Sequence, residues 1–134
     1  FRANNNPVGD VGITLLAGSP LLARMLKHGG KLEARGNAVG VPGAVALAAS
    51  PAMAACKTLD MTNNYLGDEG FASLLRSPHL GGFKVFRLVR NQITDGGIRA
   101  ARSLLDSHFD RLRLLDLSGN RLTRYGLDLL RSIR

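Results

Sequence analysis

Apolar residues along this chain recur in a short unit that begins with a strand-like spacing. The clearest copy occupies residues 112–126, which read L-R-L-L-D-L-S-G-N-R-L-T-R-Y-G. Leu115 and Leu117 are two residues apart, so on a strand they point to the same face, and their immediate neighbours point to the other. Asn120 follows where the chain has to turn, and its amide offers a donor and an acceptor to backbone groups of the turn. The unit therefore predicts a short strand followed by a turn.

The same unit recurs at a nearly constant period, which indicates a repeat protein. Its asparagines are 31, 27, 27 and 29 residues apart, and each is followed six residues later by a glycine. In chain order they are Asn6, Asn37, Asn64, Asn91 and Asn120. The match is thinner around Asn37, and only the second half of the unit survives around Asn6. We expect equal offsets to be neighbours in space, with a hydrogen-bonded ladder formed by Asn37, Asn64, Asn91 and Asn120.

Apolar residues at helical spacing follow each turn and predict one helix per unit. The predicted core positions are Ile13, Leu16, Ala44, Leu47, Phe71, Leu74, Leu75, Ile98, Ala101, Leu104, Leu105, Leu127, Leu130 and Ile133. Small residues fill the second helix, which is expected to run from Ala44 to Ala55. Asp10, Asp68 and Asp95 stand two residues before the repeated glycine. Each of these carboxylates is expected to accept hydrogen bonds from the first turn of the helix that follows it.

The spacing L-x-x-L-x-L-x-x-N-x-L resembles the leucine-rich repeat. The repeat length, the glycine six residues after the asparagine and the run L-G-D-E-G-F-A-S-L-L in the third copy resemble its ribonuclease-inhibitor-like subclass. The resemblance covers essentially the whole chain. It implies an α/β fold, a right-handed leucine-rich-repeat solenoid that forms a horseshoe segment with a parallel concave sheet and convex helices. Members of this subclass mostly bind proteins, and a few activate small GTPases.

We expect the 134 residues to form a single domain of about five repeats. The expected units are residues 1–28 (partial), 29–55, 56–82, 83–111 and 112–134 (partial). The chain opens on Phe1 rather than on an initiating Met, and neither end carries the polar cap that a solenoid needs. A segment of a longer chain is therefore the favoured expectation, and ends that are covered by a partner are the alternative.

The repeat fixes which strand side chains point away from the core onto the concave face. They are Lys31, Glu33, Arg35, Thr58, Asp60, Thr62, Val85, Arg87, Val89, Leu114, Asp116 and Ser118. Because adjacent strands lie about 4.8 Å apart, Asp60, Arg87 and Asp116 should form one column. One interpretation is a solvated row of charges that pair with one another, and the other is a binding strip. Apolar side chains on an open sheet favour an interface, so the candidate partner-binding residues are Asp60, Val85, Arg87, Val89, Leu114 and Asp116.

The net charge of +8 is concentrated in the second half of the chain. Residues 76–134 hold twelve Lys or Arg against five Asp or Glu, which gives +7. Lys57, Lys84 and Arg113 occupy the same place in successive repeats, just before each strand, and we call them the basic ridge. Such a ridge would attract an acidic protein surface or a phosphate backbone, and a plain solvated rim is the third interpretation. The absence of Trp and the scatter of basic residues over several faces weaken the case for specific nucleic-acid binding.

The sequence contains no recognisable catalytic, cofactor-binding or metal-binding constellation. It has no Gly-rich phosphate loop, and its carboxylates are spread one per repeat. Cys56 occupies a core leucine position, and His79 and His108 lack a third metal ligand. No run reaches the roughly 18–20 apolar residues of a membrane span. We therefore expect a non-enzyme without cofactors, metal, a small-molecule substrate or a membrane.

Three functions remain open at this point. The leading hypothesis is a non-catalytic protein–protein interaction module or scaffold subunit of a multi-subunit complex, which binds an acidic partner surface through the concave sheet and the basic ridge. The first alternative is an RNA-contacting structural component of a ribonucleoprotein, with strongly salt-dependent binding. The second is a GTPase activator, which only the family resemblance suggests. The lone core cysteine and the absence of a secretion signal favour an intracellular protein.

Overall fold

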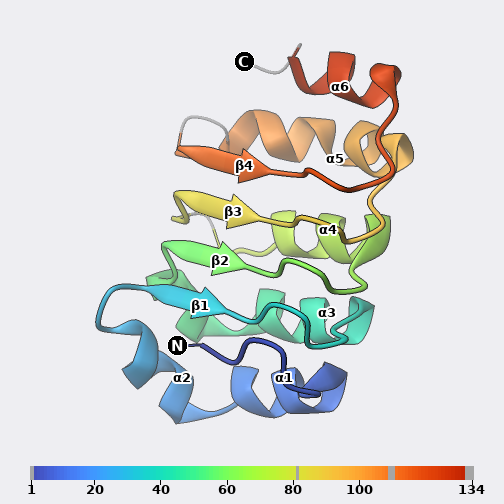
Figure 1. Ribbon diagram of the computed structural model, residues 1–134. Coiled ribbons are helices and arrows are strands. Elements are labelled where there is room, and N and C mark those ends of the chain that lie inside the picture. Colours follow the sequence, from blue (N-terminus) through green and yellow to red (C-terminus); the bar gives the residue numbers. More distant parts are fainter. Residues whose placement is uncertain (1, 81, 109–110, 132–134) are drawn as a thin grey trace.

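Strands and helices alternate along the chain, as the repeat predicts (Figure 1). The computed structural model describes residues 2–80, 82–108 and 111–131. Its strands are β1 (Lys31–Glu33), β2 (Thr58–Asp60), β3 (Val85–Arg87) and β4 (Leu114–Asp116). Its helices are α1 (Gly9–Ala17), α2 (Pro20–Leu26), α3 (Val41–Ala49), α4 (Gly67–Leu75), α5 (Asp95–His108) and α6 (Arg124–Arg131), with a 3-10 helix, η1 (Pro51–Ala55), after α3.

The strands form one parallel sheet in the order β1-β2-β3-β4, and an isolated bridge from Arg2 to Glu33 extends it beyond β1. In Figure 1 the strands stack in one layer and α3 to α6 stack in a second layer beside them. Helix α1 contacts α3, and each of α3, α4 and α5 contacts the next helix of that layer. The chain is thus an α/β solenoid with a concave parallel sheet and convex helices, which confirms the predicted fold class.

The core lies between these two layers. The strands contribute their central residues, such as Leu32, Leu59 and Phe86, and the helices contribute residues such as Leu47 and Phe71, all without exposed surface. Burying side chains of this size stabilises the fold by about 1.5–3 kcal/mol each. Their neighbours on the strands point to the other side of the sheet, so the core fixes the orientation of every concave side chain.

Most predicted core positions on the helices are buried or half-buried, but two predictions about the helices need correction. The helix expected from Ala44 to Ala55 ends at Ala49, because Pro51 forces Ser50 into an extended conformation with ψ of 117°. Leu127, expected in the core, is 45% exposed and lines a depression beside β4 instead. Ile133 lies outside the described residues.

Helix α2 has no counterpart in the later repeats and was not predicted. Ser19 caps it by accepting a hydrogen bond from Leu21 N at 3.1 Å, and Pro20 occupies its first turn. It packs against η1 through Leu22 and Leu26, which are buried. This insertion accounts for the longer spacing of 31 residues between Asn6 and Asn37.

The aspartates before the repeated glycine bond to the next repeat rather than to their own helix. Asp10 Oδ1 accepts hydrogen bonds from Gly40 N at 2.8 Å and Gly43 N at 2.9 Å. Asp68 accepts from Thr94 N at 2.7 Å and from Thr94 Oγ1 at 2.6 Å, and Asp95 contacts Thr123 in the same way. The expected caps of α1 and α4 are absent, since neither helix has a side-chain cap. These carboxylates instead tie successive repeats together.

Candidate functional site

The parallel register brings the predicted concave residues into rows that run across the strands. The first row holds Lys31, Thr58, Val85 and Leu114. The second row holds Glu33, Asp60, Arg87 and Asp116. Backbone hydrogen bonds continue the register into a third row of Arg35, Thr62, Val89 and Ser118. Asp60, Arg87 and Asp116 therefore lie side by side in the second row, which is the column that the sequence predicts.

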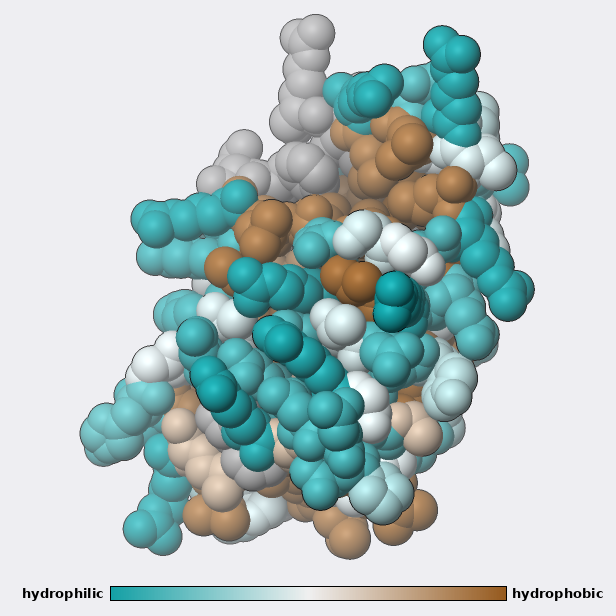
Figure 2. All heavy atoms as spheres, viewed as in Figure 1, coloured by the Kyte–Doolittle hydropathy of each residue, from teal (hydrophilic) through white to brown (hydrophobic). Residues whose placement is uncertain are grey.

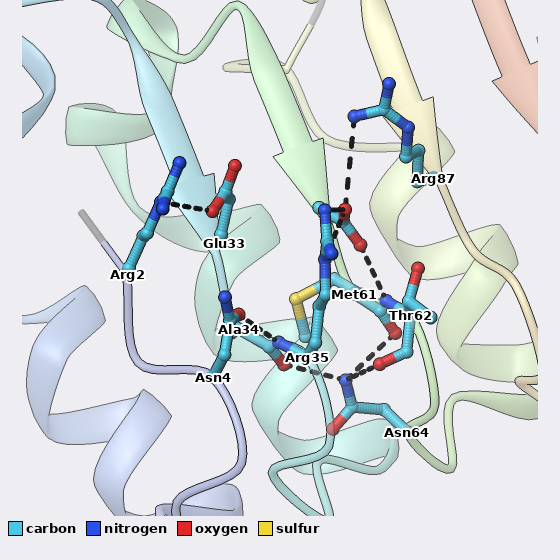
Figure 3. Close-up of polar contacts among 10 residues, drawn as sticks. Arg2, Asn4, Glu33, Ala34, Arg35, Met61, Thr62, Asn64 and Arg87 are labelled. Carbon is cyan, nitrogen blue, oxygen red and sulfur yellow. Dashed lines mark hydrogen bonds and ion pairs between the residues drawn. The ribbon is translucent and has the colours of Figure 1, made fainter.

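Asp60 is the buried centre of a charged network on this face (Figure 3). Its Oδ2 accepts a hydrogen bond from Arg35 Nε at 2.8 Å and forms an ion pair with Arg35 Nη2 at 2.7 Å, and its Oδ1 accepts a hydrogen bond from Thr62 N at 3.0 Å. Arg87 Nη1 stands 4.0 Å from the same Oδ2. With 0% of its side chain exposed, Asp60 cannot contact a partner directly. Among the candidate partner-binding residues, Asp60 is thus the one whose side chain lies below the surface, where it holds Arg35 and Thr62 N.

Arg87 is the concave arginine that has no close contact to a carboxylate among the described residues. Its side chain is 37% exposed, and its only ion pair among the described residues is the long contact with Asp60. Arg35, by contrast, already makes a hydrogen bond through Nε and an ion pair through Nη2 to that carboxylate. The register places Asp60 opposite Arg87, but Arg35, on the diagonal, occupies the Asp60 carboxylate. The guanidinium N–H groups of Arg87 therefore have no hydrogen-bond acceptor among the residues described.

Asp116 is held by its own turn. Its Oδ1 accepts hydrogen bonds from Ser118 Oγ at 2.6 Å and Ser118 N at 3.1 Å. These bonds stabilise the carboxylate and lower its pKa, and the charge of Arg87 contributes less in the same direction. Asp116 is therefore ionised and half-buried beside Arg87.

Aliphatic side chains surround Arg87. Val85 and Val89 are half-buried, and Leu114 on the neighbouring strand is 39% exposed. An arginine with free donors between aliphatic groups can bind a carboxylate while its neighbours bury apolar surface. We call Val85, Arg87, Val89, Leu114 and Asp116 the concave strip.

The basic ridge lies along the beginnings of the strands. Lys84 N donates to Lys57 O at 2.8 Å, and Arg113 N donates to Lys84 O at 2.7 Å. The three backbones are thus fixed at strand spacing, and the three side chains are exposed. Residues on adjacent strands are about 4.8 Å apart, so the ridge presents closely spaced cations beside the concave strip.

The asparagine side chains form a ladder under the turns that follow the strands. Asn64 Oδ1 accepts from Asn37 N at 3.1 Å and Val39 N at 3.0 Å, while its Nδ2 donates to Ala34 O at 2.9 Å. Asn91 and Asn120 bond in the same way to the repeat before them. Asn37 reaches Val8 N and Ala3 O in the first repeat. The ladder fixes the turns that follow the concave strip.

The residue before each of the five asparagines has a positive φ, which repeats the same turn five times. These residues are Asn5, Gly36, Asn63, Arg90 and Gly119. The pattern includes the unit around Asn6, whose sequence match is weakest. The backbone of Asn6 therefore lies in register with the other four asparagines, although among the described residues its exposed side chain donates only to Asn4 O.

Sequence reasoning missed two members of the charged network. Arg35 was expected on the concave face, but not as the main partner of Asp60, and Arg2 was not considered although its Nε lies 2.7 Å from Glu33 Oε2. The signal for Arg35 was its position diagonal to Asp60 on the neighbouring strand, because long side chains reach diagonal neighbours. Arg2 carried no such signal, since the first repeat lacks its strand pattern.

The described residues contain no cluster of three or more potential metal ligands. Cys56 is buried, and burial raises the pKa of its thiol to about 11, so it is a poor nucleophile at neutral pH. His79 is half-buried, while the side chain of His108 lies outside the described part. In the part of the chain that was searched, no helix is both long and apolar enough to cross a membrane.

An α/β solenoid with an asparagine ladder and an open concave sheet belongs to the class of repeat proteins that present one extended surface. Two family models, each described as Leucine Rich Repeat, match residues 111–133 and residues 57–75. The chain therefore contains leucine-rich repeats at these two places and has the α/β fold expected of a leucine-rich-repeat solenoid segment, and domains of this kind are in general protein-interaction modules. A search of characterised proteins gives no significant match to this chain.

Proposed function

We propose that this chain is a non-catalytic interaction module or scaffold subunit that binds an acidic protein partner within a larger assembly. We further propose that it is one domain of five repeats, that it works inside the cell, and that it belongs to the ribonuclease-inhibitor-like subclass. The α-helices on the convex side and the spacings of 27 and 29 residues support this subclass.

The observation that carries the proposal is the state of Arg87. Its guanidinium is partly exposed, has no hydrogen-bond acceptor among the described residues, and lies between Val85, Val89 and Leu114. A carboxylate of a partner would satisfy these donors in the bidentate geometry that arginine favours. The adjacent valine and leucine side chains would bury the aliphatic part of the partner. The basic ridge beside the strip would steer an acidic surface toward it.

The test is partner capture by the immobilised chain. Arg87→Glu combined with Leu114→Asp should lower capture at least about tenfold, because the change replaces an attractive charge with a repulsive one and removes an apolar contact. Arg102→Glu is the matched control, since it makes the same charge change on the exposed surface of α5. Circular dichroism would verify that each variant is folded. Capture at the wild-type level by the double variant would show that the concave strip is not the interface.

RNA contact is the second candidate, and the alignment of Lys57, Lys84 and Arg113 favours it. If the ridge binds phosphates, replacing all three with Gln should weaken RNA binding and reduce the slope of log K against log salt concentration by about two for a single-stranded RNA. Filter binding of a single-stranded RNA between low and high salt measures this slope. An unchanged slope in the triple variant would remove the candidate.

A further inference from the structure

The concave face around β1, β2 and β3 separates its charges by depth. The carboxylates of Glu33 and Asp60 are buried. Arg35 and Arg87 reach the surface, and Lys31 is exposed. Figure 2 shows teal hydrophilic atoms over most of β1 and β2, with brown apolar atoms among them at β3 and β4. Among the described concave residues of β1, β2 and β3, every exposed charge is therefore positive.

Two guanidinium groups meet above β2, which lies between β1 and β3 (Figure 3). Arg35 Nη2 lies 2.7 Å and Arg87 Nη1 lies 4.0 Å from the same oxygen, Oδ2 of Asp60. A guanidinium carries five N–H donors. Arg35 directs only Nε and Nη2 at this carboxylate, and Arg87 makes no hydrogen bond to it. Both arginines therefore keep N–H groups without an acceptor among the described residues.

Two hydroxyl groups lie on β2 between these arginines. Thr58 and Thr62 stand one row before and one row after Asp60, and both are half-buried. Thr62 N donates to Asp60 Oδ1, but neither hydroxyl has a hydrogen-bond partner within the described part of the chain. A threonine hydroxyl can donate one hydrogen bond. Donors from three neighbouring strands thus surround the surface above Asp60.

The arrangement of these donors suits an anion with more oxygens than a carboxylate has. A carboxylate is planar, and a single arginine can satisfy both of its oxygens. A phosphate monoester has three terminal oxygens that point in different directions and can accept from several sides at once. Its oxygens can therefore reach guanidinium groups on either side of β2 and a hydroxyl group between them.

The charge of the surface also favours a phosphate. Arg35 and Arg87 together exceed the negative charge of Asp60, and both oxygens of that carboxylate are already occupied. Lys57 and Lys84 are exposed at the beginnings of β2 and β3. A phosphate monoester carries a charge of about −1.5 to −2 at neutral pH, so it gains more than a carboxylate from this excess of positive charge.

We propose that Arg35 and Arg87, with the hydroxyl groups of Thr58 and Thr62, bind the phosphate of a phosphorylated side chain on the partner protein. We call these four residues the phosphate site. The inference rests on the proposed function and deepens it, because it names the anionic group that Arg87 receives. Since β2 lies between two other strands, a further repeat at either end of the solenoid would lie beside the phosphate site and not over it.

A titration with short peptides tests the proposal. The probe is a blocked peptide of alanines around one phosphoserine, and its controls carry glutamate or serine at the same place. A short single-stranded RNA supplies phosphodiesters instead. NMR of the 15N-labelled chain follows the amides of β2 and the Nε–H groups of Arg35 and Arg87. These signals should shift with the phosphopeptide, whose affinity should be at least about tenfold above that of the glutamate peptide.

Substitutions assign the binding to the phosphate site. Arg87→Gln, and Thr58→Val combined with Thr62→Val, should each lower the affinity for the phosphopeptide at least about threefold. Arg35→Lys keeps a positive charge beside Asp60 but loses the planar fork, so it should also weaken binding. Arg102→Gln makes a matched charge change on the exposed surface of α5 and should leave the affinity unchanged. Circular dichroism verifies that each variant is folded.

Three results would overturn the inference. They are equal affinity for the phosphoserine and glutamate peptides, tighter binding of the RNA at the same signals, and shifts that gather on the basic ridge or on α5 instead of β2. If partner capture depends on Arg87 and Leu114 while the glutamate peptide binds as well as the phosphopeptide, the proposed function holds and this inference fails. If capture does not depend on Arg87 and Leu114, the proposed function fails, and the titration still decides whether the phosphate site exists.

Discussion

The carboxylate of Asp68 occupies the space in which a side chain at Gly97 would begin. A Cβ at Gly97 would lie closer than 3.0 Å to Oδ1 of Asp68, and Gly126 has the same relationship to Asp95. The repeated glycine is therefore needed for close approach of the carboxylate from the preceding repeat. Gly70 differs from these two, since Val41 stands in place of the aspartate there and the nearest atom to an added Cβ belongs to Leu66 of its own repeat.

Replacement of Gly97 with Ala should lower the free energy of unfolding by about 1–3 kcal/mol, because the added methyl overpacks a filled site. Gly96→Ala is the matched control one residue earlier. An added Cβ at Gly96 would lie 3.4 Å from Thr94 Oγ1, which is ordinary contact, so this variant should keep or gain stability, by up to about 1 kcal/mol. Urea unfolding measures both variants.

A double-mutant cycle identifies the cause of this loss. If the Asp68 carboxylate is what excludes the methyl, Gly97→Ala should cost much less in a chain that already carries Asp68→Ala, with a coupling energy of about 1 kcal/mol or more. Additive effects would mean that the glycine serves its own backbone conformation, contrary to the contact described above.

The sequence predicted most of this fold because one physical rule repeats along the chain. Leucines two residues apart followed by Asn120 define a strand and a turn, and the period then placed Asp60, Arg87 and Asp116 in one column, as the register shows. The rule says nothing about residues that occur once. Helix α2 was missed for that reason, although Ser19 and Pro20 carry a local start signal.

Contacts between repeats were harder to predict than the repeats themselves. The spacing of Asp68 from its glycine suits a cap of its own helix equally well, and only the distance between stacked repeats decides that the carboxylate reaches Thr94. In the same way, the side-chain reach of Arg35, rather than the register, decides which arginine occupies the Asp60 carboxylate.

Asp60 should be necessary for stability as well as for positioning. Asp60→Ala removes the acceptor for one hydrogen bond from Arg35 Nε and one from Thr62 N, together with the ion pair to Arg35 Nη2. Bonds to charged groups contribute about 1.5–3 kcal/mol each, and because Arg35 is 44% exposed to solvent we expect a total loss of about 2 kcal/mol. Thermal unfolding measures the loss.

Thr58→Ala is the matched control, because Thr58 lies in the same strand and is half-buried. It should change the free energy of unfolding by less than about 1 kcal/mol. An equal effect of the two changes would contradict the central role of Asp60.

Replacing a buried asparagine of the ladder should destabilise the fold far more than replacing the exposed Asn6 at the first turn. Asn64→Ala leaves Asn37 N, Val39 N and Ala34 O without their partner, and each unsatisfied buried group costs about 1–3 kcal/mol. We expect a loss of about 3 kcal/mol or more in denaturant unfolding. Asn6→Ala changes the same residue type at the same repeat position, but the side chain is exposed, so its effect should stay within about 0.5 kcal/mol. Similar losses at both positions would show that the ladder does not carry the stability assigned to it.

The bond between Ser118 and Asp116 predicts a specific response to pH. The pKa of Asp116 lies below its ordinary value of 3.8, mainly because Ser118 Oγ donates to the carboxylate and then because Ser118 N does. A folded-state pKa below the unfolded one means that this stabilisation is present above about pH 4 and is lost as the pH falls through the folded value. Ser118→Ala should therefore raise the pKa of Asp116 in a 13C NMR titration and reduce the stability lost on acidification. Arg87→Gln should raise it less, because the arginine charge is the smaller cause. A larger rise with Arg87→Gln than with Ser118→Ala would mean that the charged column, and not the local turn, controls the ionisation of Asp116.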